Sequence, residues 1–305
     1  MRARTRVRPE STPERARGGG HTCASVSTAS RRARRACARV TSTNASSRAK
    51  DKICILPGLG NASGDYDALA ALFRARGHAV AIAPVSRVDW LRNAAGAVTA
   101  EYWRGTLAPR PFVDWYLERI ERACGALDDE RGDAIALVAH SAGGWLARVY
   151  VDAYATDARA RSVGKLVTLG SPMKPVDASA PGVIDQTRGI LNWVEENCRS
   201  AEAYETELGI EVTCVAGTYA RGSEDVANVA AFGIGLGYKM VCGKADVEGD
   251  GITPCETAIM DGARGLILPG VYHTPLGSST TSAKPRAWYG SEKIFNSWVR
   301  DVFGE

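Results

Sequence analysis

The sequence lacks any uninterrupted apolar run of about 18 residues, the length that a helix needs to cross a bilayer. The nearest approach, residues 226–241, is rich in glycine and is interrupted by Asn228 and Lys239. A phosphate-binding GxxxxGKS/T loop is also missing, and no CxxC or Cys/His spacing typical of zinc occurs. We therefore expect no transmembrane helix, no nucleotide-phosphate loop and no zinc motif.

The cysteines show no disulfide or metal-binding pattern. Two of the eight fall within the first 50 residues, and the other six are scattered through the rest of the chain. Reduced, mostly buried thiols are the usual state of such cysteines. Cys242 and Cys255 bracket an acidic stretch considered below, so a redox-sensitive pair at these two positions stays open.

Acidic residues are nearly absent from the first 50 positions, which hold thirteen Arg and Lys but only Glu10 and Glu14. This segment has a net charge of +11, whereas the rest of the chain has a net charge of −7. The segment also has no apolar stretch of about 7–15 residues, which a secretory signal requires. The charge of +4 on the whole chain therefore conceals a mildly acidic body.

The composition of residues 1–50, rich in Arg, Ser, Thr and Ala, is typical of an organelle transit peptide. The many Ser and Thr residues favour the chloroplast (plastid) over the mitochondrion. The alternative is a disordered basic tail that stays attached and contacts nucleic acid or an acidic membrane. In either case, we expect the folded domain to span residues 51–305.

From residue 51 onward, short apolar runs alternate with stretches of helical periodicity. The expected strands are 53–56, 79–83, 134–139, 165–169, 210–216 and 265–268, and the expected helices are 67–76, 112–127, 145–154 and 288–302. This alternation predicts an α/β fold with a mostly parallel central sheet and helices on both faces. Two long excursions, about 86–111 and 172–209, suggest lid-like insertions, satellite cores beneath loops, or both.

The stretch LVAHSAGGWLARVY, residues 137–150, places Ser141 between an expected buried strand and an expected helix. Only residues 140–144 separate the two, so the chain must turn sharply at the serine, which exposes its hydroxyl. The usual pattern is GxSxG, and here Ala139 replaces the first glycine while Gly143 keeps the second. A methyl group is the smallest departure, so Ser141 is the predicted nucleophile.

A serine hydroxyl needs a neighbouring base, usually histidine, and the base needs an orienting carboxylate. After residue 50 the chain holds three histidines, His78, His140 and His273. His78 lies in an early loop, and His140 adjoins Ser141, so its ring should diverge from the serine side chain. His273 follows the last expected strand and is the predicted base by elimination.

The orienting acid should lie between the serine and the histidine, after the preceding strand. The stretch CGKADVEGDGITP supplies Asp246, Glu248 and Asp250. Asp250 is flanked by Gly249 and Gly251, which allow a tight turn to aim the carboxylate into the site. We favour Asp250, with Asp246 as the alternative.

An anionic tetrahedral intermediate needs two N–H donors. One is expected from Ala142, which follows the nucleophile at the start of its helix. The other is expected from Leu59, in the loop PGLGNASG after the first strand, because Gly58 and Gly60 let that loop turn its amides inwards.

Residues 51–305 resemble the α/β-hydrolase superfamily along nearly their whole length. The resemblance rests on PGLGNASGDY, VSRVDWLRNAAG, YWRGTLAPRP, AHSAGGWLARVY, LGSPMKP, PGVIDQTRG, ADVEGDGITP and GVYHTPLGS. The chain looks most like lipase-like members of plants and green algae, a plastid-type group. The resemblance implies an α/β-hydrolase fold and a Ser–Asp–His triad in that chain order, which maps onto Ser141, Asp250 and His273.

These features predict a serine hydrolase, lipase- or esterase-like, that cleaves a carboxylic ester through an acyl-enzyme. The apolar excursion at 172–209 favours a lipid or other acyl ester and allows peripheral membrane contact. No metal or organic cofactor is required, and no nucleic-acid partner is expected. Two alternatives stay open: an acyltransferase that uses the same triad, and a ligand-binding protein with little turnover.

Overall fold

A computed structural model of the chain describes residues 51–129, 132–177, 183, 185–277 and 286–304. All of these residues belong to one of the two units into which the chain divides by its internal contacts, residues 48–305. The predicted transit peptide or basic tail, residues 1–50, lies outside the described residues.

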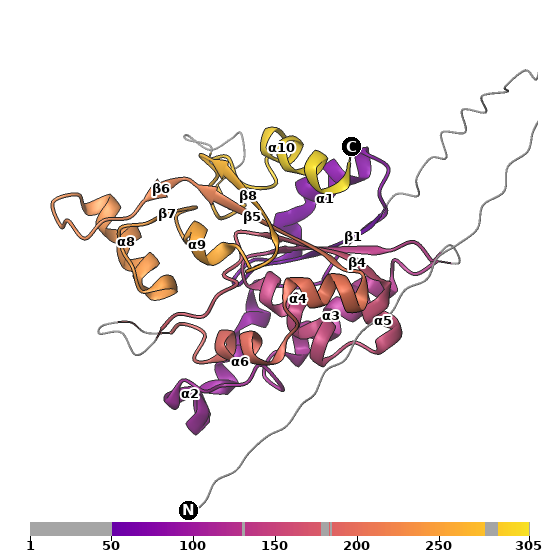
Figure 1. Cartoon of the computed structure of the whole chain (residues 1–305), viewed down its shortest axis with the longest axis horizontal. Helices are drawn as coiled ribbons and strands as arrows, with labels where there is room; N and C mark the ends of the chain where they lie inside the picture. Colours follow the sequence, from indigo (N-terminus) through magenta and orange to yellow (C-terminus); the bar gives the residue numbers. More distant parts are fainter. Residues whose placement is uncertain (1–50, 130–131, 178–182, 184, 278–285, 305) are drawn as a thin grey trace, which may run out of the picture. The chain divides into compact units, whose positions relative to one another are not determined.

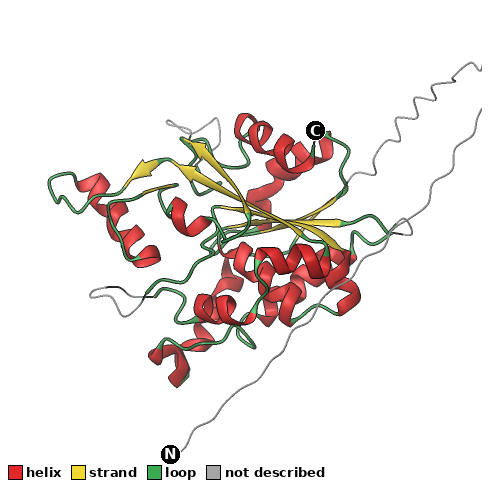
Figure 2. Cartoon of the chain, viewed as in Figure 1, coloured by secondary structure: helices red, strands yellow, loops and turns green. Residues whose placement is uncertain are grey.

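Six parallel strands form the central sheet, in the order β2-β1-β3-β4-β5-β8 (Figures 1 and 2). They are β1 (Lys52–Leu56), β2 (Val80–Ile82), β3 (Ile135–His140), β4 (Val163–Leu169), β5 (Glu211–Thr218) and β8 (Arg264–Pro269). A separate antiparallel pair consists of β6 (Ala220–Arg221) and β7 (Glu248–Gly249). The predicted α/β class, with a parallel central sheet, is confirmed.

Helices cover both faces of the sheet because its inner strands are apolar on both sides. Successive side chains of a strand point to opposite faces, so Ile53 and Ile55 of β1 join one core, and Cys54 and Leu56 join the other. The first core is closed by α1 (Asp67–Ala75) and α10 (Glu292–Phe303), and the second mainly by α3 (Asp114–Gly125) and α4 (Ala142–Ala153) (Figure 1).

The remaining described helices, three to fourteen residues long, lie in the connections between strands. They are the 3₁₀ helices η1 (Ser63–Tyr66) and η2 (Arg87–Val98), the π-helical η3 (Tyr204–Leu208), and α2 (Ala100–Arg104), α5 (Asp157–Ser162), α6 (Ile190–Asn197), α7 (Ala201–Ala203), α8 (Val229–Cys242) and α9 (Cys255–Ala258). The excursion at 86–111 has no clear α-helical period in its sequence because its longest element, Arg87–Val98, is a 3₁₀ helix, which repeats every three residues.

Helix α8 corresponds to the glycine-rich apolar stretch that the sequence left unassigned. Much of its surface is exposed, including Val229 and Leu236. Among the described residues, no helix combines the length and the hydropathy that crossing a membrane requires.

Helix α4 begins directly after Ser141, three residues before the predicted helix at 145–154. Ser141 has a φ of 52°, in the left-handed region that non-glycine residues rarely adopt, so β3 passes into α4 without an intervening loop. The second helical residue is Gly143, where an added Cβ would lie 2.7 Å from the carbonyl oxygen of Leu56. The absence of a side chain at this position therefore lets α4 approach β1 closely.

We expect Gly143→Ala to lower the free energy of unfolding by about 1–3 kcal/mol, because the new methyl group would be forced against the Leu56 carbonyl. Gly125→Ala, at the exposed end of α3, is the matched control, since a Cβ there meets no atom within 4 Å. The control should be neutral or stabilising by up to about 1 kcal/mol. Urea unfolding followed by circular dichroism measures both, and equal effects would contradict the close packing of α4 on β1.

Candidate active site

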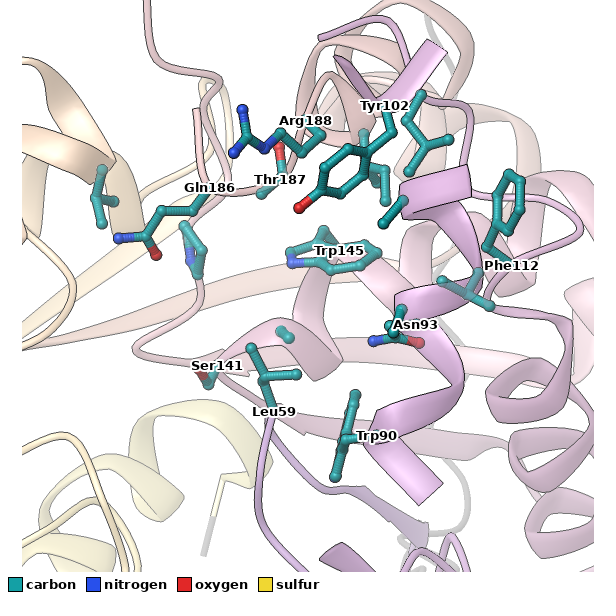
Figure 3. Close-up of a pocket in the computed structure, with 18 of the residues that line it drawn as sticks. Leu59, Trp90, Asn93, Tyr102, Phe112, Ser141, Trp145, Gln186, Thr187 and Arg188 are labelled. Carbon is teal, nitrogen blue, oxygen red and sulfur yellow. The ribbon is translucent and has the colours of Figure 1, made fainter. Parts of the chain in front are cut away.

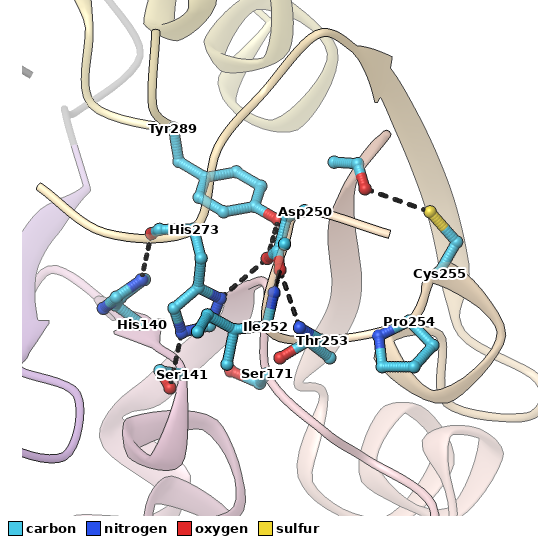
Figure 4. A network of polar contacts seen from close by, with 12 residues as sticks. His140, Ser141, Ser171, Asp250, Ile252, Thr253, Pro254, Cys255, His273 and Tyr289 are labelled. Atoms are coloured by element: carbon cyan, nitrogen blue, oxygen red, sulfur yellow. Dashed lines mark hydrogen bonds and ion pairs between the residues drawn. The ribbon is translucent and has the colours of Figure 1, made fainter. Parts of the chain in front are cut away.

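Three side chains from distant parts of the chain meet at the carboxyl end of the sheet (Figure 4). His273 Nε2 lies 2.9 Å from Ser141 Oγ, and His273 Nδ1 lies 2.7 Å from Asp250 Oδ2. A carboxylate only accepts hydrogen bonds, so Nδ1 carries the proton and Nε2 accepts from the serine hydroxyl. The structure thus brings together Ser141, Asp250 and His273 in the geometry that a nucleophile, a base and an orienting acid require.

The carboxylate of Asp250 is fully buried and accepts hydrogen bonds on both oxygens. Oδ1 accepts from the backbone N–H groups of Ile252 at 3.0 Å and Thr253 at 2.7 Å, and Oδ2 accepts from the Tyr289 hydroxyl at 2.7 Å as well as from His273. Burial, with a further contribution from the charge of Asp250, raises the pKa of the Tyr289 phenol well above its usual range, so this hydroxyl keeps its proton. The turn and the tyrosine together fix the carboxylate towards the imidazole.

His140 connects His273 to the loop that follows β1. Its Nε2 lies 2.8 Å from the carbonyl oxygen of His273, so Nε2 donates and Nδ1 accepts from the Tyr66 hydroxyl at 2.7 Å. The same hydroxyl accepts from the Gly58 N–H and from the Asn61 side-chain amide, each at 2.9 Å. Burial, and then the neighbouring His273, lower the pKa of His140 well below its usual range, so the ring is neutral.

Leu59 and Ala142, the predicted oxyanion donors, both line the cavity at Ser141. Ala142 is the first residue of α4, so its N–H has no acceptor within the helix. Gly58 packs so closely that an added Cβ would lie 2.7 Å from Ser141 Cβ, which places the Leu59 loop against the serine turn. Within the described part of the chain, no backbone carbonyl accepts the N–H of Leu59 or Ala142, and both remain available to a ligand.

The cavity next to Ser141 has a volume of about 470 Å³, within the range of about 300–1,000 Å³ that is usual for small-molecule sites (Figure 3). Most of its wall is apolar, and much of that wall comes from the two excursions. The first supplies Trp90, Tyr102 and Leu107, the second supplies Thr187, Arg188 and Ile190, and α4 supplies Trp145. Trp90 also packs edge-on against Trp115, with 5.2 Å between ring centroids, so the first excursion is anchored in the core.

The other candidates for acid and base lie elsewhere. Asp246 is exposed and forms an ion pair of 2.7 Å with Arg221. His78 lies at the amino end of the sheet, where its Nδ1 is 2.7 Å from the carbonyl oxygen of Asp51. Neither residue reaches the cavity at Ser141.

Cys242 and Cys255 are both free thiols. The Cys255 thiol donates to the carbonyl oxygen of Gly217 at 3.1 Å, and the Cys242 thiol donates to that of Lys244 at 3.3 Å. Burial raises the pKa of Cys255 to about 11 and also raises that of Cys242, so both stay protonated and weakly reactive at neutral pH. No group of three or more His, Cys, Asp or Glu side chains among the described residues could hold a metal ion.

Sequence reasoning missed two tyrosines of the site. Tyr66 ends the segment PGLGNASGDY, in which the sequence indicates a role only for Leu59 and its flanking glycines, and Tyr289 lies 39 residues beyond Asp250. Each is fully buried, and a buried tyrosine hydroxyl usually has a hydrogen-bond partner. No periodicity or spacing in the sequence indicates which partner that is.

We expect Tyr66→Phe to lower the free energy of unfolding by about 1–3 kcal/mol, because it leaves the polar groups of Gly58, Asn61 and His140 buried without their partner. Tyr154→Phe is the control, since Tyr154 is half-buried and its ring contacts Tyr150 and Arg110, while none of the described residues forms a hydrogen bond with its hydroxyl. It should change stability by less than about 0.5 kcal/mol. Differential scanning calorimetry compares the two, and losses of equal size would contradict a structural role for the Tyr66 hydroxyl.

No family model and no curated protein sequence matches the chain. Among solved structures, the chain is similar to the product of the gene lin2722 of Listeria innocua (17% identity, TM-score 0.45, covering 84% of this chain and 94% of that one). It is also similar to the metagenomic carboxyl esterase MGS0156 (15%, 0.47, 81% and 71%) and to a bromoperoxidase from Bacillus anthracis (12%, 0.42, 84% and 92%).

Proposed function

We propose that the chain is a serine hydrolase that cleaves a carboxylic ester by acyl transfer through Ser141. The observation that carries this proposal is the continuous line of hydrogen bonds from Ser141 Oγ through His273 to the buried Asp250. Ser141, at one end of these hydrogen bonds, lines a cavity of about 470 Å³ that both predicted oxyanion donors also line. A nucleophile, its base and a substrate-sized space therefore occur together.

The geometry supports a two-step reaction. Ser141 Oγ attacks the ester carbonyl carbon while His273 Nε2 takes the serine proton, and the N–H groups of Leu59 and Ala142 bind the oxyanion that forms. When the ester C–O bond breaks, His273 returns the proton to the leaving alcohol, and the acyl group stays on Ser141. Water then attacks the acyl carbon while His273 takes its proton, and the acid leaves as the bond to Ser141 Oγ breaks and His273 returns the proton to Oγ. Asp250 holds the imidazole in place during both steps.

The walls of the cavity support an acyl ester with a substantial apolar part. Trp145, Leu107 and Ile190 are buried side chains that border the same space as Ser141. Burial of an acyl chain against such walls contributes roughly 0.8 kcal/mol for each CH₂ group removed from water. A lipid or other acyl ester therefore fits the site better than a small polar ester.

We expect Ser141→Ala to abolish covalent labelling by a fluorophosphonate probe and to lower kcat/KM for p-nitrophenyl butyrate at least about 10³-fold. Ser297→Ala is the control, because Ser297 lies on the exposed side of α10 and its hydroxyl donates to the Ile294 carbonyl oxygen within the same helix. The control should react like the wild type in gel-based labelling and in spectrophotometric assays. If wild type and Ser141→Ala are labelled equally, Ser141 is not the nucleophile.

We expect Asp250→Asn to lower kcat on the order of 10³–10⁴-fold, because an amide donor facing Nδ1 favours the wrong tautomer of His273. Asp246→Asn removes a carboxylate only four residues away, from an exposed ion pair, and should change kcat by less than about twofold. Steady-state kinetics measure both variants, with circular dichroism to verify folding. A larger loss in Asp246→Asn than in Asp250→Asn would transfer the acid role to Asp246.

A further inference from the structure

Arg188 carries the only charge among the described side chains that line the cavity at Ser141. It belongs to the segment PGVIDQTRG, which the proposed triad and oxyanion donors leave without a function. In the close-up of the cavity, Arg188, Thr187 and Gln186 lie on the side away from Ser141, with Trp145 between (Figure 3). An isolated charge is unfavourable in an otherwise uncharged, mostly apolar site, so an arginine there is expected to have a negatively charged partner.

No carboxylate of the described residues forms an ion pair with the Arg188 guanidinium. Other arginines near the same excursions are paired: Arg87 with Asp65 and Arg104 with Glu101, each at 2.7 Å. Arg188 is half-buried, so the guanidinium has lost part of its water without gaining a negative partner in the chain. Its N–H donors are therefore available to a ligand.

Asp185 is the acidic residue nearest to Arg188 in the sequence, and its carboxylate has other partners. One oxygen accepts the Thr187 N–H at 2.7 Å, and the other accepts the Gly189 N–H at 2.6 Å. The backbone of Arg188 is held in the same turn, since its N–H donates to the Asp185 carbonyl oxygen at 3.2 Å and its own carbonyl oxygen accepts from Leu107 at 2.8 Å. Asp185 therefore fixes the backbone that presents Arg188.

This backbone adopts a conformation that an arginine rarely takes. Arg188 has a φ of 55°, and among the described non-glycine residues only Ser141, the proposed nucleophile, shares a positive φ. The next residue, Gly189, packs so tightly that an added Cβ would lie 2.3 Å from the Gly105 carbonyl oxygen. Unfavourable backbone conformations that are held in place in this way occur preferentially at functional sites.

The guanidinium is oriented by an aromatic ring of the opposite excursion. Its central carbon lies 4.9 Å from the centroid of the Tyr102 ring, and Tyr102 also lines the cavity. Stacking on an aromatic face restricts the guanidinium while leaving its edge open to hydrogen-bond a carboxylate or phosphate at two points. The apolar walls strengthen such a charge-assisted pair, because they exclude water from it.

From these observations, we propose that Arg188 binds an anionic oxygen group of the substrate, so that the site selects acyl esters that also carry a carboxylate or phosphate. This proposal rests on the hydrolase function proposed above. Asp185, Gly189 and Tyr102 are positioning residues for the guanidinium, and Ser141 attacks the ester at the other side of the same cavity. The class of substrate is thus an amphipathic ester with an apolar part and one negatively charged end.

The test uses two p-nitrophenyl esters of equal chain length, the octanoate and the mono-ester of suberic acid, which ends in a carboxylate. The measured quantity is the ratio of kcat/KM for the charged ester to that for the neutral one. We expect Arg188→Gln to lower this ratio about tenfold or more, because it removes a charge-assisted hydrogen bond. Arg188→Lys keeps the charge without the planar fork, and its ratio should lie between those of the wild type and Arg188→Gln.

Arg104→Gln is the matched control, since Arg104 is exposed, paired with Glu101 and absent from the cavity wall. Its ratio should equal that of the wild type. Fluorophosphonate labelling of Ser141 verifies that each variant is folded. An unchanged ratio in Arg188→Gln overturns the role of Arg188 and leaves the hydrolase proposal intact, whereas absence of Ser141-dependent hydrolysis of either ester in the wild type overturns the hydrolase proposal itself.

A second measurement needs no variant and separates the two anions. Octanoate, octyl phosphate and octan-1-ol are compared as inhibitors of hydrolysis of the neutral ester by the wild type. We expect at least one anion to inhibit about tenfold more strongly than the alcohol, with the advantage shrinking as salt is added. The stronger anion identifies the group as carboxylate or phosphate, and equal inhibition by all three compounds overturns the proposal.

Discussion

The left-handed backbone at Ser141 is the constraint on which the site depends. It lets β3 pass directly into α4, so the serine hydroxyl and the N–H of Ala142 emerge together at the carboxyl end of the sheet. Two close approaches then become necessary. Gly143 allows α4 to lie against β1, and Gly58 allows the loop after β1 to lie against the serine turn. The loop that carries Leu59 is brought beside Ser141 as a consequence.

A buried polar network extends this arrangement to both sides of the serine. On one side, the neutral His140 ring joins the Tyr66 hydroxyl to the carbonyl oxygen of His273. On the other side, one carboxylate oxygen of Asp250 accepts hydrogen bonds from His273 and Tyr289, and the other oxygen accepts from two backbone N–H groups. Because each member satisfies its neighbours in a region of low dielectric, the network holds the imidazole in a single orientation.

The cavity is shaped by the two excursions from the regular α/β pattern, and the contacts between them explain why they act together. Arg188 of the second excursion lies over the ring of Tyr102 in the first, and its carbonyl oxygen accepts the N–H of Leu107. The anionic partner that we propose for Arg188 would therefore contact both excursions at once. The same cavity would then select a substrate both by the length of its acyl chain, through the apolar wall that includes Trp145, and by its charge, through the guanidinium of Arg188.

The sequence by itself indicated the six strands of the central sheet, the helices α1, α3, α4 and α10, and the sharp turn at Ser141. It also singled out His273 and Asp250 as the candidate base and acid, since periodicity, glycine placement and the small number of histidines are local or compositional properties. It did not determine the 3₁₀ helix η2, whose side chains follow no amphipathic period, or the start of α4 at Ala142, which depends on one unusual dihedral angle. Tyr66, Tyr289 and Arg188 acquired their roles only in the tertiary structure. Their partners lie on other loops, and only the folded chain decides which buried hydroxyl meets which carboxylate and which arginine is left without one.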